Sequence, residues 1–159
     1  MILIKNISGE SLSINKHNVL AKVKNQFSKN LKLKAWFNEL LSEKNKSIDD
    51  ILTGKTLVEI NIFSKPSCFF QSQGQTKWAG VFSGSWKGQK NKTIGLGSCR
   101  FQATWFGSDS NDEKVVAELI IHELAHWVEA YSLGSIWPNK PKGIGYDTGD
   151  YVVKAFVRW

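Results

Sequence analysis

Residues 110–133, SNDEKVVAELIIHELAHWVEAYSL, carry the strongest structural signal in the chain. Ser110 and Glu113 have the spacing of a capping box, in which the serine accepts an early backbone N–H and the glutamate reaches back to the helix start. Apolar residues then recur at steps of three and four, as one buried helix face requires. Gly134 offers the left-handed conformation that often ends a helix. The pattern predicts a helix from Ser110 to Leu133.

This helix contains His122-Glu123-Leu124-Ala125-His126, an H-E-x-x-H motif that holds two of the three histidines in the chain. Residues four apart lie one above the other on a helix face, so the two imidazoles can bind one metal ion. Glu123 lies about 100° round the helix from His122, and this position suits a general base beside a water molecule. The alternative, a helix with two ordinary histidines, leaves a charged glutamate to be buried without a role.

A catalytic zinc ion takes three protein ligands and leaves a fourth position to water, so a third ligand must come from elsewhere. No histidine follows His126, which leaves the carboxylates of Glu129, Asp147 and Asp150. Glu129 lies about one turn beyond His126, where reaching the ion would compete with the geometry that directs the histidines. The residues alone leave the choice of third ligand open.

The first third of the chain is predicted to be mainly helical. Apolar positions recur at helical steps over residues 18–30 and 33–44, and residues 47–52 add a further turn before Gly54. Residues 2–7 predict a short strand ahead of them.

An α+β fold follows from the rest of the chain, because β-type patterns come after Gly54. Aromatic and β-branched runs predict three strands, at residues 56–63, 77–86 and 92–101. The links between them are too short for crossover helices, so we expect a small, mostly antiparallel sheet. Residues 147–159 predict a last helix.

Length and composition predict one domain over residues 1–159, with a Lys-rich helical part at 1–54 and the sheet and motif helix at 55–159. The formal net charge of +7 favours acidic partners, nucleic acid among them. A solvated helix face is the other interpretation of the lysines. Those that punctuate the helical pattern of the first third are Lys22, Lys24, Lys29, Lys32 and Lys34.

No apolar run approaches the roughly 20 residues that cross a bilayer, and the opening residues break at Lys5 before a signal-peptide core forms. We therefore expect a cytoplasmic protein with no membrane partner. Cys68 and Cys99 lie far apart without a C-x-x-C pattern. We expect both to be reduced, with a single buried disulfide as the alternative.

At the motif, and at Asp147-Thr148-Gly149-Asp150-Tyr151, the sequence resembles SprT-like and related small zincin metallopeptidases. The resemblance covers roughly residues 93–156. It implies a zincin-like fold, a Zn²⁺ cofactor and a third ligand at Asp147, where those families have histidine. Aspartate is the third ligand in the aspzincin group. The SprT-like zinc ribbon is absent.

The resemblance further implies that the strand before the motif helix, residues 93–101, lies along the cleft and pairs with an extended substrate. Tyr146 or Tyr151 is a candidate hydrogen-bond donor to the reacting carbonyl, with Tyr151 preferred, although packing explains either tyrosine equally well. The predicted function is a zinc-dependent peptidase that acts on a protein or peptide. The alternatives are a nucleic-acid-associated protein with a structural or vestigial metal site, and a toxin or effector delivered by another route.

Overall fold

The computed structural model describes residues 1–64, 80–83, 93–102, 109–133 and 148–159. In chain order the elements are β1 Ile2–Asn6, α1 Lys16–Lys29, α2 Leu31–Leu41, the 3₁₀ helix η1 Ser42–Lys44, α3 Ile48–Thr53, β2 Val58–Phe63, β3 Gly80–Ser83, β4 Thr93–Gly97, the 3₁₀ helix η3 Ser98–Phe101, α5 Asp109–Leu133 and α6 Thr148–Phe156.

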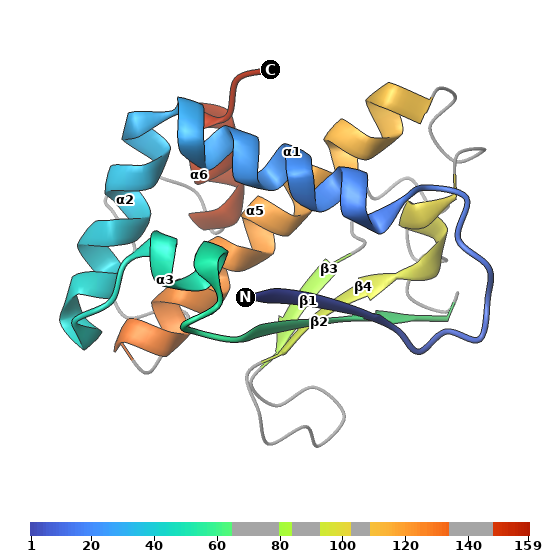
Figure 1. The fold of residues 1–159 in the computed structure, drawn as a ribbon, viewed down its shortest axis with the longest axis horizontal. Coiled ribbons are helices and arrows are strands. Elements are labelled where there is room, and N and C mark those ends of the chain that lie inside the picture. Colours follow the sequence, from blue (N-terminus) through green and yellow to red (C-terminus); the bar gives the residue numbers. More distant parts are fainter. Residues whose placement is uncertain (65–79, 84–92, 103–108, 134–147) are drawn as a thin grey trace.

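Helices cover one face of a four-stranded sheet (Figure 1). Alternate residues of the strands, such as Ile60 and Ile62 of β2 and Leu96 of β4, are fully buried. Alternation directs these side chains to one face of the sheet, the face on which a core forms. The long helix α5 packs against β3 and β4 on one side and against α1, α2 and α6 on others. It is therefore the central helix, and one buried cluster joins residues from Ile2 to Val157.

The sheet is mostly parallel, with the strand order β1-β2-β4-β3. β1 runs parallel to β2, with Ile4 opposite Ile60, and β2 runs parallel to β4. Only β3, at one edge, is antiparallel to its neighbour β4. The α+β class holds, but the prediction of a mostly antiparallel sheet is wrong.

That prediction failed because it assumed that each strand pairs with the next along the chain. β3 does not lie between β2 and β4 but takes the outer position beside β4. The strands before and after it, β2 and β4, thus become parallel neighbours. Strand order depends on contacts between distant residues, and periodicity within a strand carries no information about it.

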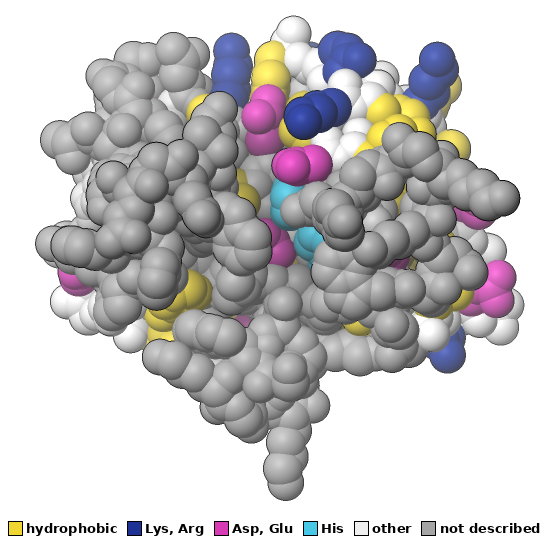
Figure 2. Space-filling view, turned by 180° about the vertical axis from the view of Figure 1, so that it is seen from behind, with side chains coloured by type: hydrophobic (Ala, Val, Ile, Leu, Met, Phe, Trp, Pro, Cys, Tyr) yellow, Lys and Arg dark blue, Asp and Glu magenta, His cyan; other side chains and the backbone are white. Residues whose placement is uncertain are grey.

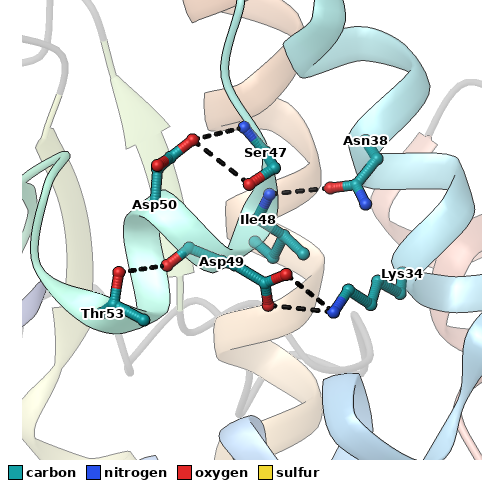
Figure 3. Close-up of polar contacts among 7 residues, drawn as sticks. All are labelled: Lys34, Asn38, Ser47, Ile48, Asp49, Asp50 and Thr53. Carbon is teal, nitrogen blue, oxygen red and sulfur yellow. Dashed lines mark hydrogen bonds and ion pairs between the residues drawn. The ribbon is translucent and has the colours of Figure 1, made fainter.

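The predicted helices of the first third are confirmed, with ends that differ by a few residues. Each begins at a polar cap: the Asn15 side chain accepts the N–H groups of His17 and Asn18, and the Asn30 side chain accepts that of Leu33. α3 begins with a capping box between Ser47 and Asp50 (Figure 3). The left-handed cap at Gly54, with φ of 102°, ends α3.

The Asp50 carboxylate accepts hydrogen bonds from the backbone N and the hydroxyl of Ser47, at 2.8 and 3.2 Å (Figure 3). The backbone hydrogen bond is the main reason that the pKa of Asp50 lies below its ordinary value. A depressed carboxyl pKa stabilises the folded state above the unfolded pKa, and this contribution is lost as the pH falls through the folded pKa. The capping box therefore weakens in acid.

The motif helix α5 begins at Asp109, so Ser110 lies inside its first turn and is not the predicted cap. Glu113, the residue expected to reach back to the helix start, contacts α1. Its carboxylate accepts from Asn18 Nδ2 at 3.1 Å and lies 3.6 Å from Lys22 Nζ. The predicted end of α5 at Leu133 and the predicted last helix, α6, are confirmed.

Cys99 is disulfide-bonded, so the prediction that both cysteines are reduced is wrong and the disulfide alternative holds. Cys68 lies outside the described residues. Among the helices that the structure describes, none combines the length and the apolarity needed to cross a membrane.

Candidate metal centre

Both motif histidines lie in the middle of α5, on a part of the helix with almost no exposed surface. Leu124 and Ala125 between them are fully buried, and His126 keeps 9% of its surface exposed. The side chain of His122 is more open, at 17%. Histidine and acidic side chains reach the surface next to one another on the face shown in Figure 2. The motif thus lies in the interior but keeps a connection to solvent.

The two imidazoles lie close enough to bind one ion. Their ring centres are 5.1 Å apart, and the ring planes are inclined by 67°. Two imidazoles on one zinc ion, with Zn–N distances of about 2.0–2.1 Å and a roughly tetrahedral angle, have ring centres roughly 5 Å apart. The spacing of His122 and His126 therefore fits zinc.

Carboxylates lie beside the Nδ1 atoms of both histidines. His122 Nδ1 lies 3.3 Å from Asp150 Oδ1, on α6, and His126 Nδ1 lies 4.0 Å from Glu129 Oε2, one turn further along α5. Metal-binding histidines commonly direct their second ring nitrogen to a carboxylate, which sets the tautomer and orients the ring. At His122 this arrangement leaves the Nε2 side of the ring for a metal ion, whereas 4.0 Å is too long for a hydrogen bond at His126.

Glu123 lies on the Nε2 side of His122. Its Oε1 atom is 3.9 Å from His122 Nε2, and its side chain is 4% exposed. A carboxylate at that distance is near the place that a metal ion bound by His122 Nε2 would occupy. Glu123 nevertheless projects from the helix in a different direction from His122. The position fits a base beside the metal, as the sequence predicted.

α6 packs directly onto His122 at Gly149. A Cβ atom at position 149 would lie 2.5 and 2.6 Å from two carbon atoms of the His122 ring and 2.7 Å from the His122 carbonyl oxygen. Carbon atoms in favourable contact are about 3.5–4.0 Å apart, so no other residue fits without a shift of the helix or of the ring. Glycine at this position allows α6 to bring Asp150 to the histidine.

Sequence reasoning missed the role of Gly149. A glycine inside the first turn of a helix is a weak signal for close approach of another segment, because glycine lowers helix stability and is retained where a side chain cannot fit. The signal does not name the partner. Only the packing of α6 on α5 identifies it as His122.

The third ligand is not placed by the structure. Asp147, the predicted ligand, and Tyr146 lie outside the described residues. Within the part of the chain that is described, the His, Cys, Asp and Glu side chains do not form a metal-binding group of three or more. Asp150 and Glu129, the other two candidates, lie nearest the Nδ1 atoms of the histidines, which favours an orienting role over binding an ion held by Nε2.

Tyr151 packs edge-on against Phe156, with ring centres 5.8 Å apart. Its side chain is partly buried against the core. Adjacent residues of a helix point about 100° apart, so Tyr151 and Asp150 face different directions from α6. These contacts support a packing role for Tyr151, and its catalytic role stays a prediction.

The strand predicted to pair with substrate has no open backbone edge. β4 pairs with β2 on one side, from Ile94 to Gly97, and with β3 on the other, from Thr93 to Leu96. Its backbone groups are used within the sheet. The expectation that residues 93–101 add a substrate strand is therefore wrong, and the reason is the outer position of β3.

The basic first third is partly neutralised by ion pairs. Lys22 Nζ lies 3.6 Å from Glu113, and Lys34 Nζ lies 2.8 Å from Asp49. Lys24, Lys29 and Lys32 are exposed. Nucleic-acid binding by these helices stays a prediction, with fewer available cations than the sequence suggested.

Comparisons with protein-family models, with curated proteins and with solved structures found no match to this chain.

Proposed function

We propose that the chain is a zinc-dependent peptidase whose ion is held by His122 and His126 and whose general base is Glu123. The observation that carries this proposal is the geometry of the motif. Two imidazoles with ring centres 5.1 Å apart lie beside a buried glutamate that is 3.9 Å from one of them. The resemblance of the motif to SprT-like and aspzincin peptidases supports the same reaction.

Zinc would supply a Lewis acid that lowers the pKa of a water molecule and polarises the substrate carbonyl. Glu123 takes the proton of that water on its carboxylate and later gives it to the leaving amine. Its burial suits the task, because few solvent molecules can compete for the carboxylate. Asp150 accepts the Nδ1 proton of His122 and so directs Nε2 to the ion.

Crystals of the zinc-loaded chain, measured at the zinc absorption edge, test the site directly. We expect one anomalous peak between His122 and His126, with three protein ligands and one position open to solvent. A mixture of fluorogenic peptides should be cleaved by the same material, with activity lost on chelation and restored by zinc. An ion enclosed by four protein atoms would indicate a structural site and would refute the peptidase.

Alanine substitutions distinguish the three carboxylates. We expect Asp147→Ala to weaken zinc binding most, because it removes a ligand. Asp150→Ala and Glu129→Ala should weaken it less, by roughly 10-fold to 100-fold, as substitutions of residues that orient ligands do. The measurement is the zinc dissociation constant in competition with a chromophoric chelator. A larger effect of Asp150→Ala than of Asp147→Ala would make Asp150 the ligand.

The cytoplasmic location predicted from the sequence is not supported by the disulfide at Cys99. Disulfides persist mainly in oxidising compartments. We infer that the peptidase acts in an oxidising compartment, where the disulfide at Cys99 persists.

A further inference from the structure

α6 brings both Gly149 and Asp150 to His122, yet it is a short helix of nine residues. Isolated helices shorter than about 12–15 residues are marginal in water, so α6 depends on tertiary contacts for its position. Besides its packing on α5 and the bond from Trp159 to Glu118, its C-terminal end is held by hydrogen bonds from the N-terminal third of the chain. The H-E-x-x-H motif by itself assigns this part of the chain no role in the metal centre.

Two side chains near the junction of α1 and α2 bind the end of α6. Asn30 Nδ2 donates to the carbonyl of Phe156, the last residue of the helix. Gln26, which is 3% exposed, binds the backbone of Arg158 at two points. Its Nε2 donates to the Arg158 carbonyl at 2.6 Å, and its Oε1 accepts the Arg158 N–H at 3.1 Å. Both side chains thus bind backbone groups at the end of α6, so these bonds do not depend on the side chains of Phe156 and Arg158.

Asn30 joins three helices at once. Its backbone N–H donates to the Gln26 carbonyl and ends α1, and its Oδ1 accepts the Leu33 N–H at 3.1 Å and begins α2. The remaining amide group, Nδ2, reaches α6. The position of α6 is therefore coupled to the angle between α1 and α2. α6 also packs against α2 as well as α5, and Figure 1 shows it beside these helices.

We propose that Gln26 and Asn30 are positioning residues of the metal centre: they hold α6 so that Gly149 rests on His122 and Asp150 faces its Nδ1 atom. We call these two residues the brace. The expected effect on zinc binding rests on the proposed function: a displaced α6 would turn the His122 ring, and the turned ring would bind zinc more weakly. It assigns the N-terminal helices a part in building the site.

Asn30→Asp tests the brace selectively. Aspartate is as good a helix N-cap as asparagine, so α2 keeps its start, but the donor to the Phe156 carbonyl is replaced by an acceptor. Asn15→Asp is the matched control, because Asn15 caps α1 in the same way through His17 and Asn18 and its hydrogen bonds stay within α1. Comparing the two variants separates an effect on α6 from an effect on a helix cap.

Gln26→Met provides a second test, since it keeps the size of a buried side chain and removes both bonds to Arg158. Its control is Asn38→Leu, in which the lost bond joins α2 to α3: Asn38 Oδ1 accepts the Ile48 N–H at 2.7 Å (Figure 3). The control lies in the same helical third and does not involve α6.

Two quantities should be measured on each variant: the zinc dissociation constant, and the imidazole ¹⁵N chemical shifts of His122 in the metal-free protein, which report its tautomer. We expect Asn30→Asp and Gln26→Met to weaken zinc binding roughly 10-fold and to raise the share of the Nε2–H tautomer. Asn15→Asp and Asn38→Leu should leave both quantities at the wild-type values, even where they lower the unfolding temperature.

Equal effects of the brace variants and their controls, or unchanged His122 shifts in the brace variants, would overturn the brace. A wild-type chain that binds no zinc would instead overturn the proposed function. The His122 shifts are measured without metal, so they would still decide whether the brace positions the ring.

Discussion

Replacing Glu123 with glutamine should abolish peptide hydrolysis while zinc binding persists. The amide keeps the size of the side chain but cannot take the proton of the attacking water. Loss of a general base typically slows a reaction by 10²–10⁴-fold. Glu123 is 3% exposed, so no solvent group can easily replace it. The rate with a fluorogenic peptide and the zinc content of the same sample are the two measurements.

Glu118→Gln is the matched control for this variant. Glu118 lies on the same helix, but its carboxylate accepts a solvent-exposed hydrogen bond from Trp159 Nε1, with a length of 2.6 Å. The same change of chemistry there should leave hydrolysis unaffected. Retained activity in Glu123→Gln would exclude Glu123 as the base, and loss of zinc in that variant would make Glu123 a ligand.

Replacing Gly149 with alanine should lower the stability of the protein and damage the metal centre together. The added methyl group would overlap the His122 ring and its carbonyl oxygen at 2.5–2.7 Å. Either α6 moves away from α5 or the ring turns, and both changes separate Asp150 from His122 Nδ1. A displacement of about 1 Å can reduce catalysis 10²-fold, and overpacking costs about 1–3 kcal/mol of stability.

The free energy of unfolding, zinc affinity and hydrolysis should therefore all fall in Gly149→Ala. Gly9→Ala separates site damage from general destabilisation. Gly9 has a φ of 73°, where alanine is strained, but its Cβ would meet no atom within 4 Å. That variant should lose stability and keep zinc affinity. Normal zinc affinity in Gly149→Ala would show that the close approach of α6 does not matter for the site.

Helices were predictable because their signals are local. Asn15, Asn30 and Ser47 begin helices through hydrogen bonds to residues two or three positions away. Apolar spacing then indicates which side is buried. Local reasoning does not reach the contacts of Glu113 with Asn18 and Lys22, because both belong to a distant helix.

The order of strands in the sheet was not predictable from these signals. β3 and β4 were expected near their observed places, but nothing in their residues shows that β3 takes the edge and β4 the interior. In the folded chain both strands pack on α5, and β3 takes the edge beside β4. This position of β3 also removes the expected substrate-binding edge of β4.

The spacing of His122, Glu123 and His126 follows from the helix alone, because four residues make about one turn. Any folded state that keeps α5 places the two imidazoles on one side. What surrounds them does not follow from that spacing. Asp150 reaches His122 because α6 rests on α5 at Gly149 and is held by Gln26 and Asn30. The bonds of Gln26 and Asn30 join residues 132 and 126 positions apart, and they exist only once the core has brought the ends of the chain together.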